Sequence, residues 1–156
     1  MRRLALGSRG MKSSRSFKSI ALAVAAAGGL AVPYAPIALA NPQGATVVNG
    51  QVSIGQPAPN VTEIRNSAGA IINWHEFSIG AGETTRFIQP SAASAVLNRV
   101  VGANPSQILG QLASNGRVFL INPNGVVFGP GAKIDTAGLV ASTLDITDAD
   151  FLAGRL

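Results

Sequence analysis

The chain has 156 residues, of which 47% are hydrophobic, 12% charged and 5% aromatic, a balance that excludes a disordered, charge-rich tail. Its net charge of +5 would suit an anionic partner such as nucleic acid. However, six of the twelve basic residues lie in the first eighteen positions, and from Asn41 onward six basic and seven acidic residues leave a net charge of −1. We therefore expect no nucleic-acid partner.

The first 40 residues have the pattern of a signal peptide. A basic stretch runs into the uncharged segment 20–32, made of Ala, Leu, Val, Ile and Gly. Its thirteen residues are fewer than the about 20 that a membrane-spanning helix needs, so we expect no stable membrane anchor. Ala38 and Ala40 form the small-x-small pattern that signal peptidase cleaves, with Asn41 as the first residue of the mature part. Translation can start at Met1 or at Met11.

The N-terminus of the exported protein tests this division into a signal peptide (1–40) and a mature part (41–156). Sequencing is expected to begin at Asn41, because cleavage follows the small residue Ala40. Exported protein that still carries Arg15 would contradict the prediction.

The mature part has no cysteine, so backbone ladders and apolar burial must hold its fold together.

Short apolar runs, separated by Gly and Asn, follow one another from Asn41 onward, which is typical of β-strands. Asn49-Gly50 suits a type I′ turn, so we predict an antiparallel hairpin at the start of the mature part. The predicted strands are, in chain order, 45–48, 51–54, 61–65, 70–74, 84–88, 95–101, 117–121, 126–128, 133–135 and 139–142.

One short helix is predicted at residues 104–112. Asn104 can act as N-cap, Pro105 suits the first helical position, and Gln107 follows three residues after the cap. A helix of two turns is not stable alone, so we expect it to cover a sheet edge or an open end of the fold. Its apolar face consists of Ile108, Leu109 and Leu112.

The C-terminal third combines strands of three to five residues with corners of two to four. Short strands that turn corners around an apolar lumen are typical of the coils of a parallel β-helix, and the mature part is long enough for about five such coils. We therefore predict an all-β fold, a parallel β-helix with an N-terminal antiparallel cap and the short helix.

The tetrapeptide Asn122-Pro123-Asn124-Gly125 satisfies a type I turn at each position. The side chain of Asn122 can accept a hydrogen bond from the backbone two residues on, and Pro123 has the required φ. Such a turn needs no partner to explain it, so a structural role is the simpler interpretation. Recognition by a partner protein is the alternative.

The segment 117–143 around this turn resembles the haemagglutination-activity region of filamentous haemagglutinin-like exoproteins, the secretion domain of two-partner secretion systems. The resemblance extends back through 72–79, 87–90 and 95–100 and covers 41–156 almost continuously. It implies a right-handed β-helix with an N-terminal cap. The upstream Asn-Pro-Asn-Leu motif of many members is missing, so nothing tied to that motif is carried over.

The resemblance also implies a function. It suggests the secretion-signal domain of a large exported adhesin or haemolysin-like exoprotein, which passes through the periplasm and is secreted or held at the cell surface. The implied partner is a dedicated outer-membrane transporter with periplasmic recognition domains, and the domain would nucleate β-helix folding outside the cell. Since the chain stops at Leu156, short of a whole secretion domain, we expect a fragment or a truncated reading frame.

Few residues offer catalytic or metal-binding chemistry. His75 is the only histidine, and strand neighbours such as His75 and Glu76 point to opposite faces. Asp145, Asp148 and Asp150 are spaced like a calcium cluster, but the Gly and closing Glu of an EF-hand loop are absent, so we interpret them as a polar loop. Five aromatic residues are expected to pack in the lumen or the cap: Trp74, Phe77, Phe87, Phe119 and Phe128.

We therefore expect no catalytic residue, no cofactor and no metal, and not an enzyme. The alternative is a fragment of a polysaccharide-processing β-helix enzyme, which shares the fold. Such an enzyme would need carboxylates and bases that recur at the same place on successive coils, and this sequence has few charges from which to build them.

Overall fold

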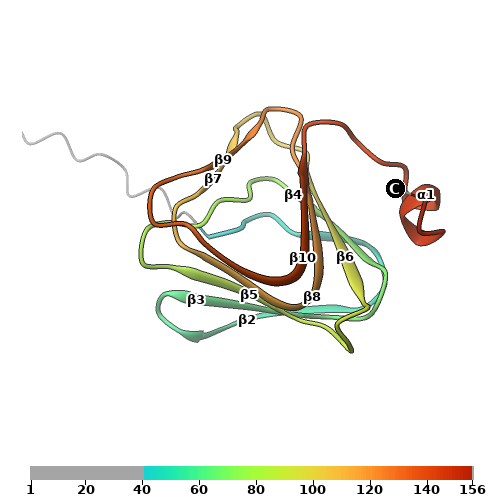
Figure 1. Ribbon diagram of the computed structural model, residues 1–156, viewed down its shortest axis with the longest axis horizontal. Helices are drawn as coiled ribbons and strands as arrows, with labels where there is room; N and C mark the ends of the chain where they lie inside the picture. The colour runs from blue at the N-terminus through green and yellow to red at the C-terminus, as the bar shows by residue number, and fades with distance from the viewer. Residues whose placement is uncertain (1–40, 156) are drawn as a thin grey trace, which may run out of the picture. The chain divides into compact units, whose positions relative to one another are not determined.

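The structure is a computed structural model that describes residues 41–155. These residues form a β-solenoid of about four turns, whose three sides surround a lumen when seen end-on (Figure 1). The predicted β-helix is thereby confirmed, although it has about four turns and not the five that were expected. Its elements are β1 (Thr46–Asn49), β2 (Val52–Ala58), β3 (Val61–Asn66), β4 (Ala70–Trp74), β5 (Thr84–Ile88), β6 (Ala95–Val100), β7 (Ser106–Ile108), β8 (Gln111–Ile121), β9 (Val126–Phe128), β10 (Lys133–Ser142) and α1 (Asp148–Leu152).

Parallel strands from successive turns stack into three faces. The first face contains β3, β5 and the N-terminal halves of β8 and β10, and the second contains β4, β6 and their C-terminal halves. The third consists of β7 and β9. The long strands β8 and β10 each cover two faces, so the strands predicted at 133–135 and 139–142 are one strand with a register shift between Thr136 and Gly138.

The N-terminal cap is antiparallel, as predicted, but its strands pair differently. β1 pairs with β4 and β2 pairs with β3, and β1 and β2 lie at opposite ends of the sheet order. The predicted hairpin is therefore wrong, and Asn49-Gly50 forms a corner in which Gly50 has a φ of 81°. An isolated two-stranded hairpin has little stability, whereas each strand here covers the exposed edge of a larger stack.

The helix predicted at 104–112 is also wrong. Ser106–Ile108 form β7, in which Ser106 and Ile108 are buried while Gln107 is exposed, the alternation of a strand. The Ser106 backbone N–H donates to Gly125 O at 2.9 Å on the next turn, and the Leu109 N–H donates to Ile79 O at 2.8 Å on the preceding one. Ladder bonds on both sides outweigh the local capping signal.

The one helix of the described residues is α1, which includes Asp148 and Asp150 of the expected polar loop. Thr147 is its N-cap, and its side-chain oxygen accepts from the Asp150 backbone N–H. The spacing of Thr147 and Asp150 is that of a capping box and could have predicted this helix. No helix within residues 41–155 is long and apolar enough to cross a membrane.

The lumen holds the main hydrophobic core. Trp74, Phe77 and Phe87 lie in it, with ring centroids 5.6 Å apart for Trp74 and Phe77 and 6.4 Å apart for Phe77 and Phe87. The prediction of lumen or cap packing is wrong for Phe119, which points outward between Val118 and Leu120 of the core. Phe128 is the register partner of Ile108 in the lumen, so it lies on the predicted side, but it is 42% exposed because no further turn of the described residues covers it.

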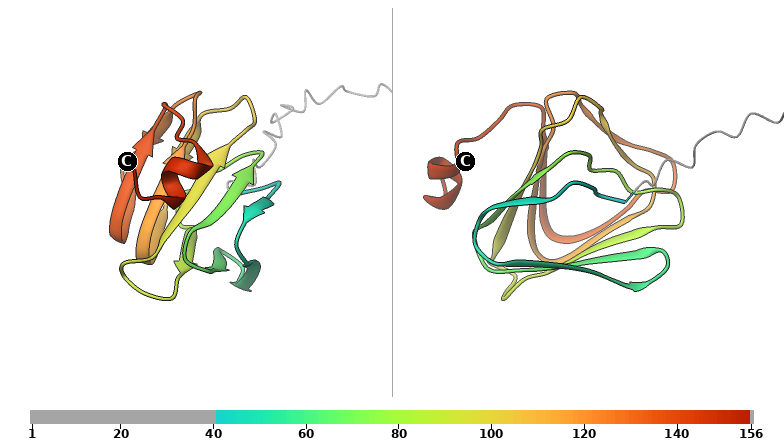
Figure 2. Two further views of the ribbon diagram at one scale, coloured as in Figure 1. Left: turned by 90° about the vertical axis from the view of Figure 1, so that its right-hand side faces the viewer. Right: turned by 180° about the vertical axis from the view of Figure 1, so that it is seen from behind.

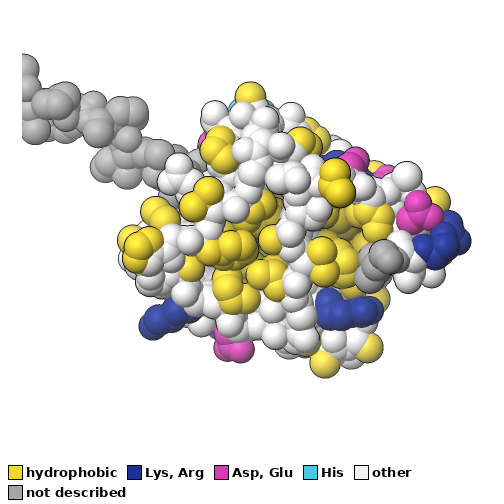
Figure 3. All heavy atoms as spheres, turned by 45° about the horizontal axis from the view of Figure 1, so that its top comes forward, with side chains coloured by type: hydrophobic (Ala, Val, Ile, Leu, Met, Phe, Trp, Pro, Cys, Tyr) yellow, Lys and Arg dark blue, Asp and Glu magenta, His cyan; other side chains and the backbone are white. Residues whose placement is uncertain are grey.

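Apolar side chains remain exposed at the end of the solenoid where β10 lies (Figure 3). Strands β9 and β10 form the last turn of the described residues, and no further strand covers β10 there. The exposed apolar residues of these two strands are Val127, Phe128, Ile134 and Val140.

Candidate functional site

The Asn122–Gly125 turn forms the corner between β8 and β9. The Gly125 backbone N–H donates to Asn122 O at 2.9 Å, which closes the turn. The side-chain oxygen of Asn122 accepts from the Asn124 backbone N–H at 2.9 Å, as its position in the turn predicts. Gly125 has a φ of 108°, which a residue with a side chain rarely adopts. The predicted turn is therefore confirmed.

Asn122 joins this corner to both neighbouring turns of the solenoid. Its side chain is completely buried, and Nδ2 donates to Asn104 O and to Ser106 Oγ, each at 3.0 Å. Its backbone N–H donates to Ser142 O at 2.9 Å on the following turn. A short amide side chain suits this position because it both accepts from the turn and donates to the preceding coil.

The exposed part of the corner consists of Pro123 and Asn124. Asn124 Nδ2 donates to Gly102 O at 2.8 Å. Gly102 in turn packs so closely on the first turn that a Cβ there would lie 2.1 Å from His75 O. Three successive corners are thus stacked on one another, and in the folded state a partner could reach Pro123 and Asn124 but not Asn122.

The other predicted site residues do not gather at this corner. Ala38 and Ala40 lie outside the described residues, and Asn41 is half-buried at their start. The exposed His75 is tied through its backbone N–H to Gln43 O at 3.0 Å, while Glu76 Oε1 accepts from Asn104 Nδ2 at 2.6 Å. Asn104, predicted as a helix cap, therefore supports the turn with its carbonyl and binds Glu76 with its amide.

Each of the three C-terminal aspartates forms a salt bridge with an arginine. Asp145 and Asp148 bind Arg99 at 2.7 and 3.0 Å, and Asp150 binds Arg155 at 2.8 Å. Burial lowers the pKa of Arg99, but its bonds to Asp145 and Asp148 outweigh burial and raise it. The Thr147 hydroxyl and then Arg155 lower the pKa of Asp150. Residues 41–155 contain no group of three acidic, His or Cys side chains placed to hold a metal ion.

Charged residues do share one row on the outside of the first face. Glu63, Arg86, Ala113 and Asp135 are register partners on successive strands. Glu63 is bound by Arg65 at 2.7 Å and by Arg86 at 2.9 Å. The backbone positions of Glu63 and Asp135 are three strand spacings apart, roughly 14 Å. This exceeds the separation of about 5 to 9.5 Å between the paired carboxylates of glycosidases.

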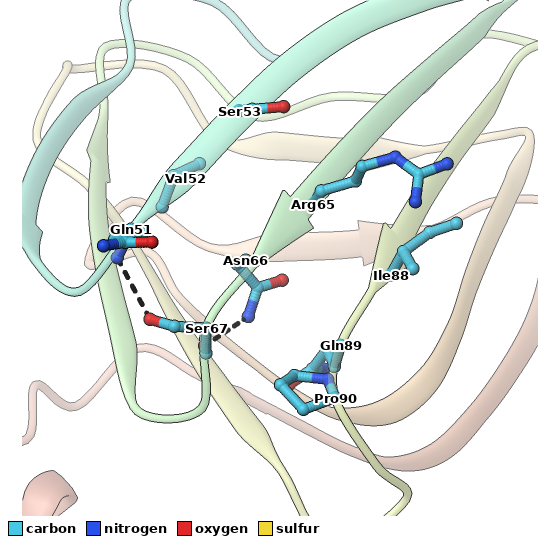
Figure 4. A pocket seen from close by; sticks show the side chains of 9 residues that line it. All are labelled: Gln51, Val52, Ser53, Arg65, Asn66, Ser67, Ile88, Gln89 and Pro90. Atoms are coloured by element: carbon cyan, nitrogen blue, oxygen red, sulfur yellow. Dashed lines mark hydrogen bonds between the residues drawn. The ribbon is translucent and has the colours of Figure 1, made fainter.

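A hollow of about 560 Å³ lies at the corner after β3 (Figure 4). Gln51 and Ser67 are hydrogen-bonded to each other at its edge, and Asn66 Nδ2 donates to Ser67 O. Gln89 Nε2 donates to Ser114 Oγ and Arg117 O across the coil. The NH2 groups of Asn66 and Gln89 thus support the corner, while the side-chain oxygens Asn66 Oδ1 and Gln89 Oε1 are buried without a hydrogen-bond partner among the described residues. The guanidinium of Arg65 is held by Glu63.

Sequence reasoning missed the partners of the turn, Asn104 and Ser106. They lie 18 and 16 residues before Asn122, less than one coil along the chain. Polar residues 16 to 18 positions before Asn122 could have indicated partners on the preceding coil. The predicted helix, however, placed both residues elsewhere.

The family model described as "TPS secretion domain" matches residues 38–155. Two heme/hemopexin-binding proteins of Haemophilus influenzae, one from strain Rd, are 44% and 43% identical to the chain over 105 and 106 residues. Each match covers 67% of this chain but only 12% and 11% of the relative, so the chain spans a small part of their length.

The chain also resembles solved structures. The crystal structure of the HMW1 secretion domain from Haemophilus influenzae matches with a TM-score of 0.71 and 48% identity. The match covers 73% of this chain and 30% of that one. Sequence and fold therefore agree on one family.

Proposed function

This chain belongs to the family of TPS secretion domains, and from that premise we propose that residues 41–155 are the secretion-signal region of a larger exoprotein of a two-partner system. The exoprotein passes through the periplasm and is secreted or held at the cell surface. Its partner is an outer-membrane transporter with periplasmic recognition domains, and signal peptidase removes residues 1–40. The family match over 38–155 is the observation that carries this proposal.

Features of the chain support passage in an extended form. The mature part has no cysteine and a net charge of −1, so neither a disulfide nor a strong charge opposes transit. Strands β1 and β2 lie at the two ends of the sheet order, and each has one edge without a strand partner among the described residues. Such edges can pair with a strand of another protein by β-augmentation.

The burial of Asn122 bears on when the turn acts. In the folded state its side chain is completely covered, so a transporter can contact it only before the solenoid forms. After folding, the same side chain holds the corner to the preceding coil. We therefore propose that the main role of the turn is in folding, after the chain has left the transporter. Any direct contact between Asn122 and the transporter takes place earlier, while the chain is unfolded.

Replacing both Asn122 and Asn124 with alanine tests the role of this turn. We expect less exoprotein in the medium when the variant is expressed with its transporter, because the corner loses its side-chain bonds to Asn104, Ser106 and Gly102. Periplasmic export should be unchanged, since the signal peptide is intact. Immunoblots of medium and periplasm measure both quantities, and Asn60→Ala, in another exposed turn, is the matched control.

A binding measurement separates recognition from stability. The periplasmic domains of the transporter are titrated with the urea-unfolded chain, diluted at the moment of mixing. A variant that binds normally but is secreted poorly has a folding defect, whereas weaker binding shows direct contact. Unchanged secretion, together with no binding of residues 41–156 to the transporter, would overturn the proposal.

A further inference from the structure

After β10 the chain leaves the solenoid and returns along its outside. Residues 143–155, here called the clip, include α1 and lie beside the second face (Figures 1 and 2). The clip adds no rung to the stack. It packs instead on the outward side chains of the earlier strands β4, β6 and β8.

An apolar strip on the outside of the second face receives the clip. The strip consists of Ile71 on β4, Leu97 on β6, and Phe119 and Ile121 on β8. Phe151 of α1 is only 6% exposed, and its ring meets that of Phe119 edge-on, with centroids 5.4 Å apart. Because the strip is built from three successive turns, the cluster that contains Phe151 is complete only when all three are stacked.

A single arginine fixes the clip beside this strip. Arg99 lies on β6, two residues after Leu97, and its side chain is 15% exposed. Its guanidinium donates to Asp145 Oδ1 and Ile146 O at 2.7 Å and to Asp148 Oδ1 at 3.0 Å. It also reaches Asn73 Oδ1 on β4 at 3.4 Å. Arg99 therefore connects the clip to two of the three strands.

We propose that the clip closes last during folding of this chain and then acts as a kinetic lock on the stack formed by residues 41–142. Ile71, Leu97 and Phe119 are register partners, so the docking surface for Phe151 does not exist until β4, β6 and β8 are aligned. A helix of five residues has no stability of its own to form earlier. Contacts that form after the transition state slow unfolding and leave the folding rate unchanged.

The lock goes beyond the proposed function, because it concerns the purified chain without any transporter. Failure of the lock would leave secretion by the transporter untouched, and failure of recognition would leave the lock untouched. The two proposals are thus decided by separate experiments.

Stopped-flow folding and unfolding of the purified chain in urea tests the lock. Phe151→Ala is expected to raise the unfolding rate at least about tenfold and to change the folding rate less than about twofold. Arg99→Ala should act in the same direction. Leu144→Ala is the control, since Leu144 is in the clip but 79% exposed, and should change neither rate. A folding rate that falls as much as the unfolding rate rises, or two unchanged rates, would overturn the proposal.

Pulse-labelling hydrogen exchange during refolding tests the order in the unaltered chain, so it does not depend on a variant that folds. The amides of Phe151 and Ala153, which donate to Thr147 O and Ala149 O, are expected to become protected after those of Leu97 and Phe119. Protection of the helix amides before the strand amides, or together with them, would show that the clip is not last.

Discussion

Replacing Gly110 with alanine is expected to lower the free energy of unfolding by about 3 kcal/mol or more. A Cβ at this position would lie 2.3 Å from Glu83 O and 2.3 Å from Gly80 O, and 2.9 Å from the Ile79 side chain. Two of these atoms belong to the backbone of the preceding turn and cannot rotate away. The coils must therefore separate locally. This weakens two hydrogen bonds, from the Gly110 N–H to Ile79 O and from the Lys133 N–H to Gly110 O.

Urea denaturation followed by circular dichroism measures this loss as a lower midpoint. Gly55→Ala is the matched control, because a Cβ at Gly55 would meet no atom within 4 Å and its φ is not in the left-handed region. This control should change stability by less than about 0.5 kcal/mol. Equal midpoints for the Gly110 variant and the unaltered chain would show that the turns are not packed as closely as described.

Trp74→Ala is expected to cost about 3 to 5 kcal/mol, a large share of the about 5 to 15 kcal/mol typical of a domain. Trp74 is 1% exposed, packs edge-on against Phe77 in the lumen, and donates its indole N–H to Asn98 Oδ1 at 2.9 Å. Its loss leaves both a cavity and a buried acceptor without a partner. The same urea titration measures the effect.

Two further variants separate the contributions of the ring volume and of the hydrogen bond to the cost of Trp74→Ala. Trp74→Phe keeps a ring in the lumen but leaves Asn98 Oδ1 unpaired, so we expect a loss of about 1 to 3 kcal/mol. Val101→Ala, at a position 60% exposed, should be close to neutral. If Trp74→Phe costs as much as Trp74→Ala, the hydrogen bond and not the volume of the ring dominates, contrary to this interpretation.

Local sequence patterns predicted the parts of the fold that depend on local chemistry. The strands at 70–74, 84–88 and 126–128 have the predicted bounds. Glycines flank 126–128 on both sides, Gly69 precedes 70–74, and in 84–88 inward and outward residues alternate. The failures share one cause. Asn49-Gly50 and Asn104-Pro105 carry good local signals for a hairpin and a helix, but pairing with the neighbouring turns decides the outcome, and that pairing is not local.

The candidate site divides in the same way. The hydrogen bond within the Asn122–Gly125 turn follows from the order of four residues and was predicted. Its bonds to Asn104 and Ser106 depend on the length of a coil, which the weak repeat does not define. The clip was missed because Arg99 and its aspartates are 46 and 49 residues apart, and only the folded stack brings them together.

Because of the antiparallel cap, the two ends of the solenoid present different strand directions and hydrogen-bond patterns. At the cap, β1 and β2 run against the strands they cover, so the evenly spaced parallel ladder stops there. At the other end, β10 continues the parallel ladder and presents apolar side chains such as Ile134 and Val140. Further strands can continue the parallel ladder in the same direction at the β10 end, and two such solenoids cannot join cap to cap in one continuous parallel stack, because β1 and β2 reverse the strand direction there.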